Sequence, residues 1–396
     1  MSVLAVLCPV LVGFALVSAP AWWSDPQPEI PAPAVTQPSA PPVSSWRPGE
    51  PVFRAPSRKP EIVGINYHGI WSDKSPEQRA RILDSFVAAG TTWVRMDIAW
   101  ASLQPNGPDQ FDPKGVAALD ERLQEIRSRG LKTLIMFYWP PEWSSGTSAK
   151  NGVPKDPEQY GEAAAWLAAR WPDEVQAIEL WNEPDLDAFL ANTSVATYTE
   201  LLKAAYPKIK AANPAMTVVA GAPTGINTDW YQEMYALGGG GHFDALGIHP
   251  YIGRTDQPPT AWDPNFPQYY MGNIANLVAL MARNGDSGKQ IWATEYGWSS
   301  HDNSSYGPDL PPWKRGVSEQ LQADYLIEAQ QVLAQWPQVK ASFWYTDRNG
   351  TTGDAQEDNL GVLTYDLAPK PSWYALRCAA GSVCGPTGAT TPGTAD

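Results

Sequence analysis

Short apolar runs alternate with longer amphipathic stretches along most of the chain, from Glu61 onward. The runs are rich in β-branched and aromatic residues, which predicts strands, and the stretches between them repeat their apolar positions with the period of a helix. We expect eight strands, at Ile62–Tyr67, Trp93–Ile98, Thr133–Tyr138, Gln176–Trp181, Thr217–Ala220, Ala245–His249, Gln290–Glu295 and Lys340–Tyr345.

Helix signals mark the stretches between these strands. Ser75 is placed as an N-cap with Pro76 at the first helical position, and Gly90 and Gly130 stand where C-terminal caps belong. The expected helices are Pro76–Ala89, Val116–Ser128, Glu158–Arg170, Val195–Ala212, a short one near Asp229–Leu237, Gly272–Arg283, Val317–Gln335 and Ser372–Cys378.

A regular succession of strand and helix predicts an α/β fold with a parallel sheet, and eight such units close into a single (β/α)8 TIM barrel. The competing fold is an open doubly wound sheet, which carries a glycine-rich turn after its first strand. The turn Tyr67–Trp71 lacks that pattern, and the glycine run Gly238–Gly241 lacks the Lys-Ser/Thr of a phosphate loop. We therefore expect one barrel domain over residues 61–380.

The two ends of the chain differ from this pattern. Residues 1–21 are uncharged and largely apolar and include Ala19-Pro20-Ala21, which predicts a signal peptide; the absence of Lys or Arg before Trp23 leaves an N-terminal anchor as the alternative. Twelve prolines between Pro20 and Pro60 predict an extended linker over residues 22–60. Residues 381–396 are expected to form a flexible tail. The expected location is secreted or attached to the cell envelope.

Composition narrows the choice of partner and chemistry. The formal net charge of −14 disfavours nucleic acid and anionic membranes and suits neutral or cationic material. Of the three cysteines, Cys378 and Cys384 enclose a short loop and are expected to form a disulfide in an oxidising compartment, with two reduced thiols as the alternative. No Cys/His pattern indicates a metal, and we expect no cofactor.

Polar and aromatic side chains gather at the ends of the predicted strands, where a barrel of this type places its chemistry. Glu183 lies in Trp181-Asn182-Glu183-Pro184 and Glu295 in Thr294-Glu295-Tyr296-Gly297. Two carboxyl groups facing one sugar are the minimal machinery of glycoside hydrolysis. The other strand ends contribute amides, imidazoles, a cation and aromatic rings: Asn66, His68, Arg95, Asp97, Tyr138, Trp139, His249, Tyr251, Trp344, Asp347 and Arg348.

These motifs resemble the clan A glycoside hydrolases, a retaining group that includes families 5 and 39. The Asn-Glu-Pro motif is specific, the motif around Glu295 is moderately so, and the resemblance covers Ile62 to Leu376. Tyr138 and Trp139 stand where the cellulase-like branch has a histidine, which favours family 39. The resemblance implies these roles: Glu183 as general acid/base, Glu295 as nucleophile, Asn182 at the substrate 2-hydroxyl, Arg95 and Tyr251 at the nucleophile, His249 in the same subsite and Trp344 as its floor.

Each assignment has a structural alternative. Glu183 could be an acid at a helix N-terminus, and Glu295 could be a salt-bridge partner of Arg95. His68 is as readily a structural histidine as a substrate contact. Asp97 is expected to brace the barrel, and Glu179 is expected to make a contact inside the barrel. Two or three of a set of tryptophans that follow strand ends are expected to line sugar subsites: Trp71, Trp100, Trp139, Trp143 and Trp298.

The sequence therefore predicts an exported, monomeric, retaining glycoside hydrolase that cleaves β-glycosidic bonds in a neutral poly- or oligosaccharide. A non-catalytic glycan-binding protein on the same scaffold, or a transglycosylase using the same residues, are the alternatives. Long loops at Gly253–Tyr269, Ser299–Gly316 and Asp347–Leu360 are expected to shape access to the site.

Overall fold

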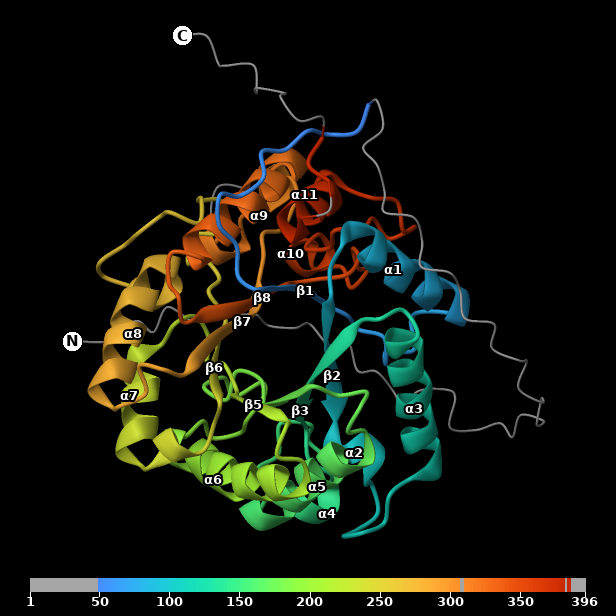
Figure 1. Ribbon diagram of the computed structural model, residues 1–396, viewed down its shortest axis with the longest axis vertical. Helices are drawn as coiled ribbons and strands as arrows, with labels where there is room; N and C mark the ends of the chain where they lie inside the picture. The colour runs from blue at the N-terminus through green and yellow to red at the C-terminus, as the bar shows by residue number, and fades with distance from the viewer. Residues whose placement is uncertain (1–48, 307–309, 382, 386–396) are drawn as a thin grey trace.

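The computed structural model describes residues 49–306, 310–381 and 383–385, which form a closed barrel of parallel strands surrounded by helices (Figure 1). The strands pair in chain order and β1 closes the ring against β8. The predicted (β/α)8 barrel is confirmed. The predicted signal peptide or anchor with Cys8, residues 22–48 of the predicted linker, and most of the predicted tail lie outside the described residues.

All eight predicted strands are present, with ends that differ by a few residues. They are β1 (Ile62–Asn66), β2 (Trp93–Ala99), β3 (Lys132–Tyr138), β4 (Ala177–Leu180), β5 (Thr217–Ala220), β6 (Ala245–Ile248), β7 (Gln290–Tyr296) and β8 (Val339–Trp344).

The predicted helices also form. They are α1 (Pro76–Ala89), α3 (Pro113–Arg127), α5 (Pro157–Arg170), α6 (Val195–Ala212), α7 (Thr228–Ala236), α8 (Ile274–Arg283), α9 (Glu319–Leu333) and α11 (Pro371–Ala380). Ser75 caps α1 through a reciprocal capping box with Gln78. Short helices that the sequence pattern did not predict lie in the loops: α2 (Trp100–Leu103), α4 (Glu142–Ser145), α10 (Ala355–Asp358) and five 3₁₀ turns at 239–241, 267–269, 271–273, 303–306 and 312–314. None of the helices in the described part of the chain is long and apolar enough to cross a membrane.

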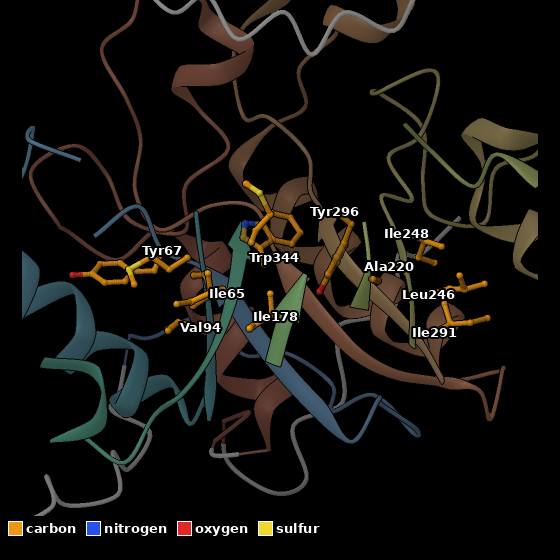
Figure 2. Close-up of a cluster of buried hydrophobic side chains, with 14 of the residues drawn as sticks. Ile65, Tyr67, Val94, Ile178, Ala220, Leu246, Ile248, Ile291, Tyr296 and Trp344 are labelled. Atoms are coloured by element: carbon orange, nitrogen blue, oxygen red, sulfur yellow. The ribbon is translucent and has the colours of Figure 1, made fainter. Parts of the chain in front are cut away.

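Two layers of apolar side chains hold the barrel together. Residues such as Ile65, Val94, Ile178 and Leu246 face outward from the strands and are buried against the helices (Figure 2). A second cluster fills the barrel interior: Trp93, Leu134, Ala177, Val219, Ala245, Trp292, Ala341 and Phe343. Since strand side chains alternate between the two faces, the residues two positions after these lie further along the interior.

The last part of the predicted linker packs on the barrel. Phe53 is buried in the core, and its backbone N–H donates to the carbonyl of Cys384 at 3.0 Å. Cys384 is joined to Cys378 on α11 by a disulfide, in agreement with the prediction. Arg377 on α11 also forms an ion pair with Glu50 at 2.7 Å. Residues 49–53 and the end of α11 are therefore held together, although the sequence placed the first in an extended linker and the second in the barrel domain.

Candidate active site

A buried layer of charged and polar side chains lies directly above the apolar filling of the barrel. Arg95, Glu179 and Thr294 each come two residues after a member of that filling, so the alternation of the strands turns them inward as well. Arg95 donates from Nε to Glu179 at 2.6 Å, and the Thr294 hydroxyl donates to the same carboxylate at 2.8 Å. Glu179 makes the internal barrel contact that was expected of it, and its charge is matched by Arg95.

Glu183 is positioned by an irregular turn at the end of β4. The backbone has positive φ at Trp181 (77°) and at Glu183 itself (38°), and the Glu183 N–H donates to the carbonyl of Ala222 at 2.9 Å. Non-glycine residues in this region of φ carry strain, and such strain collects at functional sites. The side chain is 1% exposed, and its Oε1 lies 2.9 Å from Nδ1 of His249.

Glu295 lies near the end of β7, where the pairing with β8 shifts register between Ala293 and Tyr296. A register irregularity re-aims side chains, which explains how the Thr294 and Glu295 side chains, consecutive on one strand, both engage groups of the barrel interior. Glu295 accepts a hydrogen bond from Arg95 at 2.6 Å on Oε1 and from the Tyr251 hydroxyl at 3.1 Å on Oε2.

Arg95 also sets the orientation of Asn182. Its Nη2 donates to Oδ1 of Asn182 at 2.9 Å, and a guanidinium group can only donate, so this atom of Asn182 must be the oxygen. The Asn182 amide nitrogen is then the group left for a ligand. Nη1 of Arg95 donates in addition to Asn66, whose own amide nitrogen donates to the carbonyl of Thr294 at 3.0 Å.

His249 connects the two acids. Its Nδ1 contacts Glu183, and its Nε2 lies 3.8 Å from Oε1 of Glu295. One ligand atom from each of the three side chains falls within 4.8 Å of the others. The carboxyl groups of Glu183 and Glu295 are thus close to the separation of about 5–5.5 Å that characterises retaining glycosidases, and well below the about 6.5–9.5 Å of inverting enzymes.

The two acids have opposite pKa shifts. Burial raises the pKa of Glu183, and the charge of Glu295 adds to this rise against the opposing effect of His249. Burial also acts on Glu295, but there the charges of His249 and Arg95, with hydrogen bonds from Arg95 and Tyr251, outweigh it and hold the pKa below its ordinary value. One buried carboxyl group therefore favours the protonated form and its neighbour the ionised form.

A pocket opens above these acids and is walled mainly by aromatic rings. Besides the buried layer, it is lined by His68, Trp71, Met136, Tyr138, Phe189 and Tyr345. Asp97 accepts hydrogen bonds from Trp71 at 2.9 Å and contacts Nδ1 of His68 at 3.0 Å, and the rings of His68 and Trp71 are stacked at 4.0 Å. Asp97 braces the wall of the pocket, and His68 is both held by it and present at the pocket surface.

Trp344 differs from its expected place. It has no exposed surface, packs in the core against Tyr296 and Trp298, and donates from Nε1 to the carbonyl of Leu360 at 3.1 Å (Figure 2). A ring with no exposed surface cannot stack on a sugar, so the assignment of Trp344 as the floor of the subsite is wrong; the next residue, Tyr345, lines the pocket. Successive residues leaving a strand face opposite ways, and this alternation was the available signal.

The tryptophans that follow strand ends also divide into one that lines the pocket and others that do not. Trp71 lines the pocket, whereas Trp100 and Trp298 are buried in the core and Trp143 donates to the carbonyl of Gln104 at 2.7 Å. Trp139 is half-buried, stacked on Tyr138 at 4.2 Å, and does not line the pocket. Of this set, Trp71 is the member that lines this pocket.

Glu183, His249 and Glu295 also form the cluster of possible metal ligands found among the described residues. Nδ1 of His249 and Oε1 of Glu183 already contact each other, and the positive charge of Arg95 lies 2.6 Å from Glu295. A divalent cation at this place would meet that guanidinium at short range. The arrangement suits proton transfer and attack by a carboxylate better than it suits metal binding.

A (β/α)8 barrel with two acids this close together at the ends of β4 and β7 defines a class, the retaining glycoside hydrolases. Within that class, the chain belongs to the cellulase family, glycosyl hydrolase family 5, whose sequence profile matches residues 49–338. The preference for family 39 that was drawn from Tyr138 and Trp139 is wrong, because the matching profile is that of family 5. No curated relative matches the chain.

Several solved structures share the fold. A family 39 glycoside hydrolase from the gut symbiont Bacteroides cellulosilyticus superposes with a TM-score of 0.64 at 24% identity, over 81% of this chain and 64% of its own length. A monomeric β-xylosidase from Caulobacter crescentus has a TM-score of 0.58 at 19% identity, over 82% and 69%. A subfamily 18 member of family 5 from Streptomyces cattleya, in complex with GlcNAc, has a TM-score of 0.60 at 16% identity, over 81% and 80%. The chain spans less than two thirds of the first of these proteins.

Proposed function

We propose that this protein is an exported β-glycosidase that cleaves a neutral poly- or oligosaccharide by double displacement, with Glu295 as nucleophile and Glu183 as general acid/base. The observation that carries the proposal is the pairing of two buried carboxyl groups within 4.8 Å whose pKa values are shifted in opposite directions. Two such groups with opposite protonation preferences can supply an acid and a nucleophile at the same bond.

In the first step, Glu295 attacks the anomeric carbon while Glu183 gives its proton to the departing glycosidic oxygen. The attacking carboxylate becomes an ester, so its negative charge disappears and no longer raises the pKa of Glu183. Glu183 then takes a proton from water, which attacks the anomeric carbon and releases Glu295. His249 contacts Glu183 and lies near Glu295, so it can stabilise negative charge on either of the two carboxyl groups.

Asn182 and Tyr345 are proposed to position the reacting sugar. The Asn182 amide nitrogen, left open by the contact of Oδ1 with Arg95, can donate to a hydroxyl next to the anomeric carbon. Tyr345 lines the pocket and can present its ring to an apolar sugar face. His68 offers an imidazole edge at the same surface. Trp139, stacked on Tyr138 outside the pocket, is kept as a contact for a longer substrate.

The test is hydrolysis by purified protein of a panel of aryl β-glycosides and neutral polysaccharides. Glu295→Gln should lower kcat by several orders of magnitude while sugar binding remains. Glu183→Gln should lower hydrolysis of substrates with poor leaving groups far more than of activated aryl glycosides, because only the former require protonation. Near-normal hydrolysis of an unactivated substrate by either variant would remove the assignment.

The same measurements separate the alternatives. A non-catalytic glycan-binding protein would bind sugars equally in wild type and Glu295→Gln and release none. A transglycosylase would yield products longer than its substrate, visible by mass spectrometry. Export is proposed from the apolar residues 1–21 and is tested by N-terminal sequencing of protein recovered outside the cell. The monomeric state is proposed from the barrel sequence and is tested by light scattering.

A further inference from the structure

A second pocket lies beside the proposed catalytic pocket and shares Tyr345 with it. It is bordered by Tyr251, whose hydroxyl donates to Glu295 at 3.1 Å, by Gly297 just after β7, and by Gln356 and Glu357 of α10. Its position next to the nucleophile is that of a sugar unit adjoining the one that reacts. Two tyrosine rings and Leu360 supply apolar surface for such a unit.

Glu357 is the charged group of this second pocket. Its side chain is partly buried, and within residues 49–306, 310–381 and 383–385 no hydrogen bond or ion pair engages its carboxyl group. The nearby cation Lys314 is already paired with Asp354 at 2.8 Å. The carboxyl group of Glu357 thus borders the pocket with no protein partner among these residues, and a ligand in the pocket can supply one.

The charges around Glu357 favour binding of a cation in this pocket. Burial, together with the negative charges of Asp354, Glu295 and Glu183, raises the pKa of Glu357 to about 8, against the opposing charge of Lys314. The free pocket therefore takes up a proton near neutral pH. A ligand that carries its own cation can replace that proton, and the overall net charge of −14 attracts cationic material over longer range.

We propose that this second pocket binds a sugar unit with a free amino group and that Glu357 recognises the protonated amine. The inference rests on the proposed glycosidase function and changes its substrate, from a wholly neutral glycan to one that contains unacetylated, cationic amino sugar. Gln356, on the same short helix, offers an amide to the hydroxyls of that unit, and Tyr251 and Tyr345 offer their rings.

Binding of matched sugars tests the proposal without requiring turnover. The probes are glucosamine, galactosamine and mannosamine, each beside its N-acetyl form and its parent hexose, with dissociation constants measured by calorimetry near pH 7.5. In at least one series, wild type should bind the free amine about tenfold tighter than both neutral forms, since an ion pair with hydrogen bonds replaces a neutral contact. Glu357→Gln should abolish that preference.

Glu233→Gln is the matched control, because Glu233 is an exposed carboxylate on α7 away from both pockets. It should keep the preference for the amine and the rate of aryl glycoside hydrolysis. Equal binding of amine and neutral forms by wild type in all three series, or a preference that survives in Glu357→Gln, overturns the inference. Preference for the amine without hydrolysis of any aryl glycoside overturns the proposed function and leaves the Glu357 site standing.

Discussion

Nδ1 of His249 lies 2.9 Å from Oε1 of Glu183, while the opposite ring nitrogen lies 3.8 Å from Glu295. One imidazole therefore stands between the two carboxyl groups, fully buried with them. Groups this close titrate as a set, and their apparent pKa values belong to the set as a whole. The pH dependence of catalysis therefore reports the protonation state of this set of groups.

The dependence of kcat/KM on pH should be bell-shaped. Activity requires ionised Glu295, whose pKa is held below its ordinary value, and protonated Glu183, whose pKa is raised mainly by burial. Activity should rise with pH through the first pKa and fall through the second. Profiles measured on an aryl β-glycoside from about pH 3 to about pH 9 test this, and Glu183→Gln should lose the alkaline limb. A profile without an alkaline limb in wild type would contradict the assignment of the acid.

Arg95→Lys should shift the acid limb of that profile to higher pH. Arg95 donates to Glu295 at 2.6 Å and holds Asn182 and Glu179 at the same time, a fork that the single ammonium of lysine cannot reproduce. With less positive charge beside Glu295, its pKa should rise by about one unit or more. The free energy of unfolding should fall as well, because Glu179 loses part of its partner. An unchanged acid limb in a folded variant would show that Arg95 has no electrostatic role at the nucleophile.

Tyr251→Phe should lower kcat/KM, because the Glu295 carboxylate loses a hydrogen-bond donor. The Tyr251 hydroxyl donates to Oε2 of Glu295 at 3.1 Å, and a hydrogen bond to a charged group contributes about 1.5–3 kcal/mol. The expected loss of kcat/KM is on the order of tenfold to a hundredfold. Tyr325→Phe on α9 is the control, since Tyr325 packs beside Trp298 outside both pockets. Equal effects of the two substitutions would argue against a role for Tyr251 at the nucleophile.

Tyr345 and Trp344 are adjacent in sequence, but replacing each by alanine should affect different properties, sugar binding for Tyr345 and stability for Trp344. Trp344 is wholly buried, so Trp344→Ala should lower the free energy of unfolding by about 3–5 kcal/mol. Tyr345 lines both pockets, so Tyr345→Ala should raise KM and weaken sugar binding with a smaller loss of stability. Urea unfolding and steady-state kinetics separate the two effects. A Trp344→Ala protein of normal stability with weakened sugar binding would restore Trp344 as the floor.

Cys384→Ser should destabilise the end of α11 and the chain that packs on it. The disulfide spans a separation of six residues, and closing so short a loop contributes about 2 kcal/mol by the chain-entropy relation. Loss of the bond should also release Phe53, whose N–H donates to the carbonyl of Cys384. Urea midpoints with and without reductant measure the effect, and Cys378→Ser/Cys384→Ser should be indifferent to reductant. Equal midpoints for wild type in both conditions would contradict a stabilising role.

Much of the fold follows from local pattern. Strand and helix positions were predicted because apolar residues alternate or recur with the period of each element, and Gly90 and Ser75 mark ends by their own backbone and capping chemistry. Glu183 and Glu295 could be chosen because each lies at the carboxyl end of a strand, and in a barrel these ends meet. The short helices α2, α4 and α10 escaped prediction because four residues carry no periodic signal.

The sequence by itself determined the barrel, the two acids and the cation beside them, because these depend on strand order and on the period of two along each strand. The tertiary structure alone decided that Phe53 packs beside the disulfide and that Glu357 borders a second pocket near Glu295. Those outcomes depend on how irregular turns and distant loops pack against one another, and the free energy of that packing is absent from any local stretch of sequence.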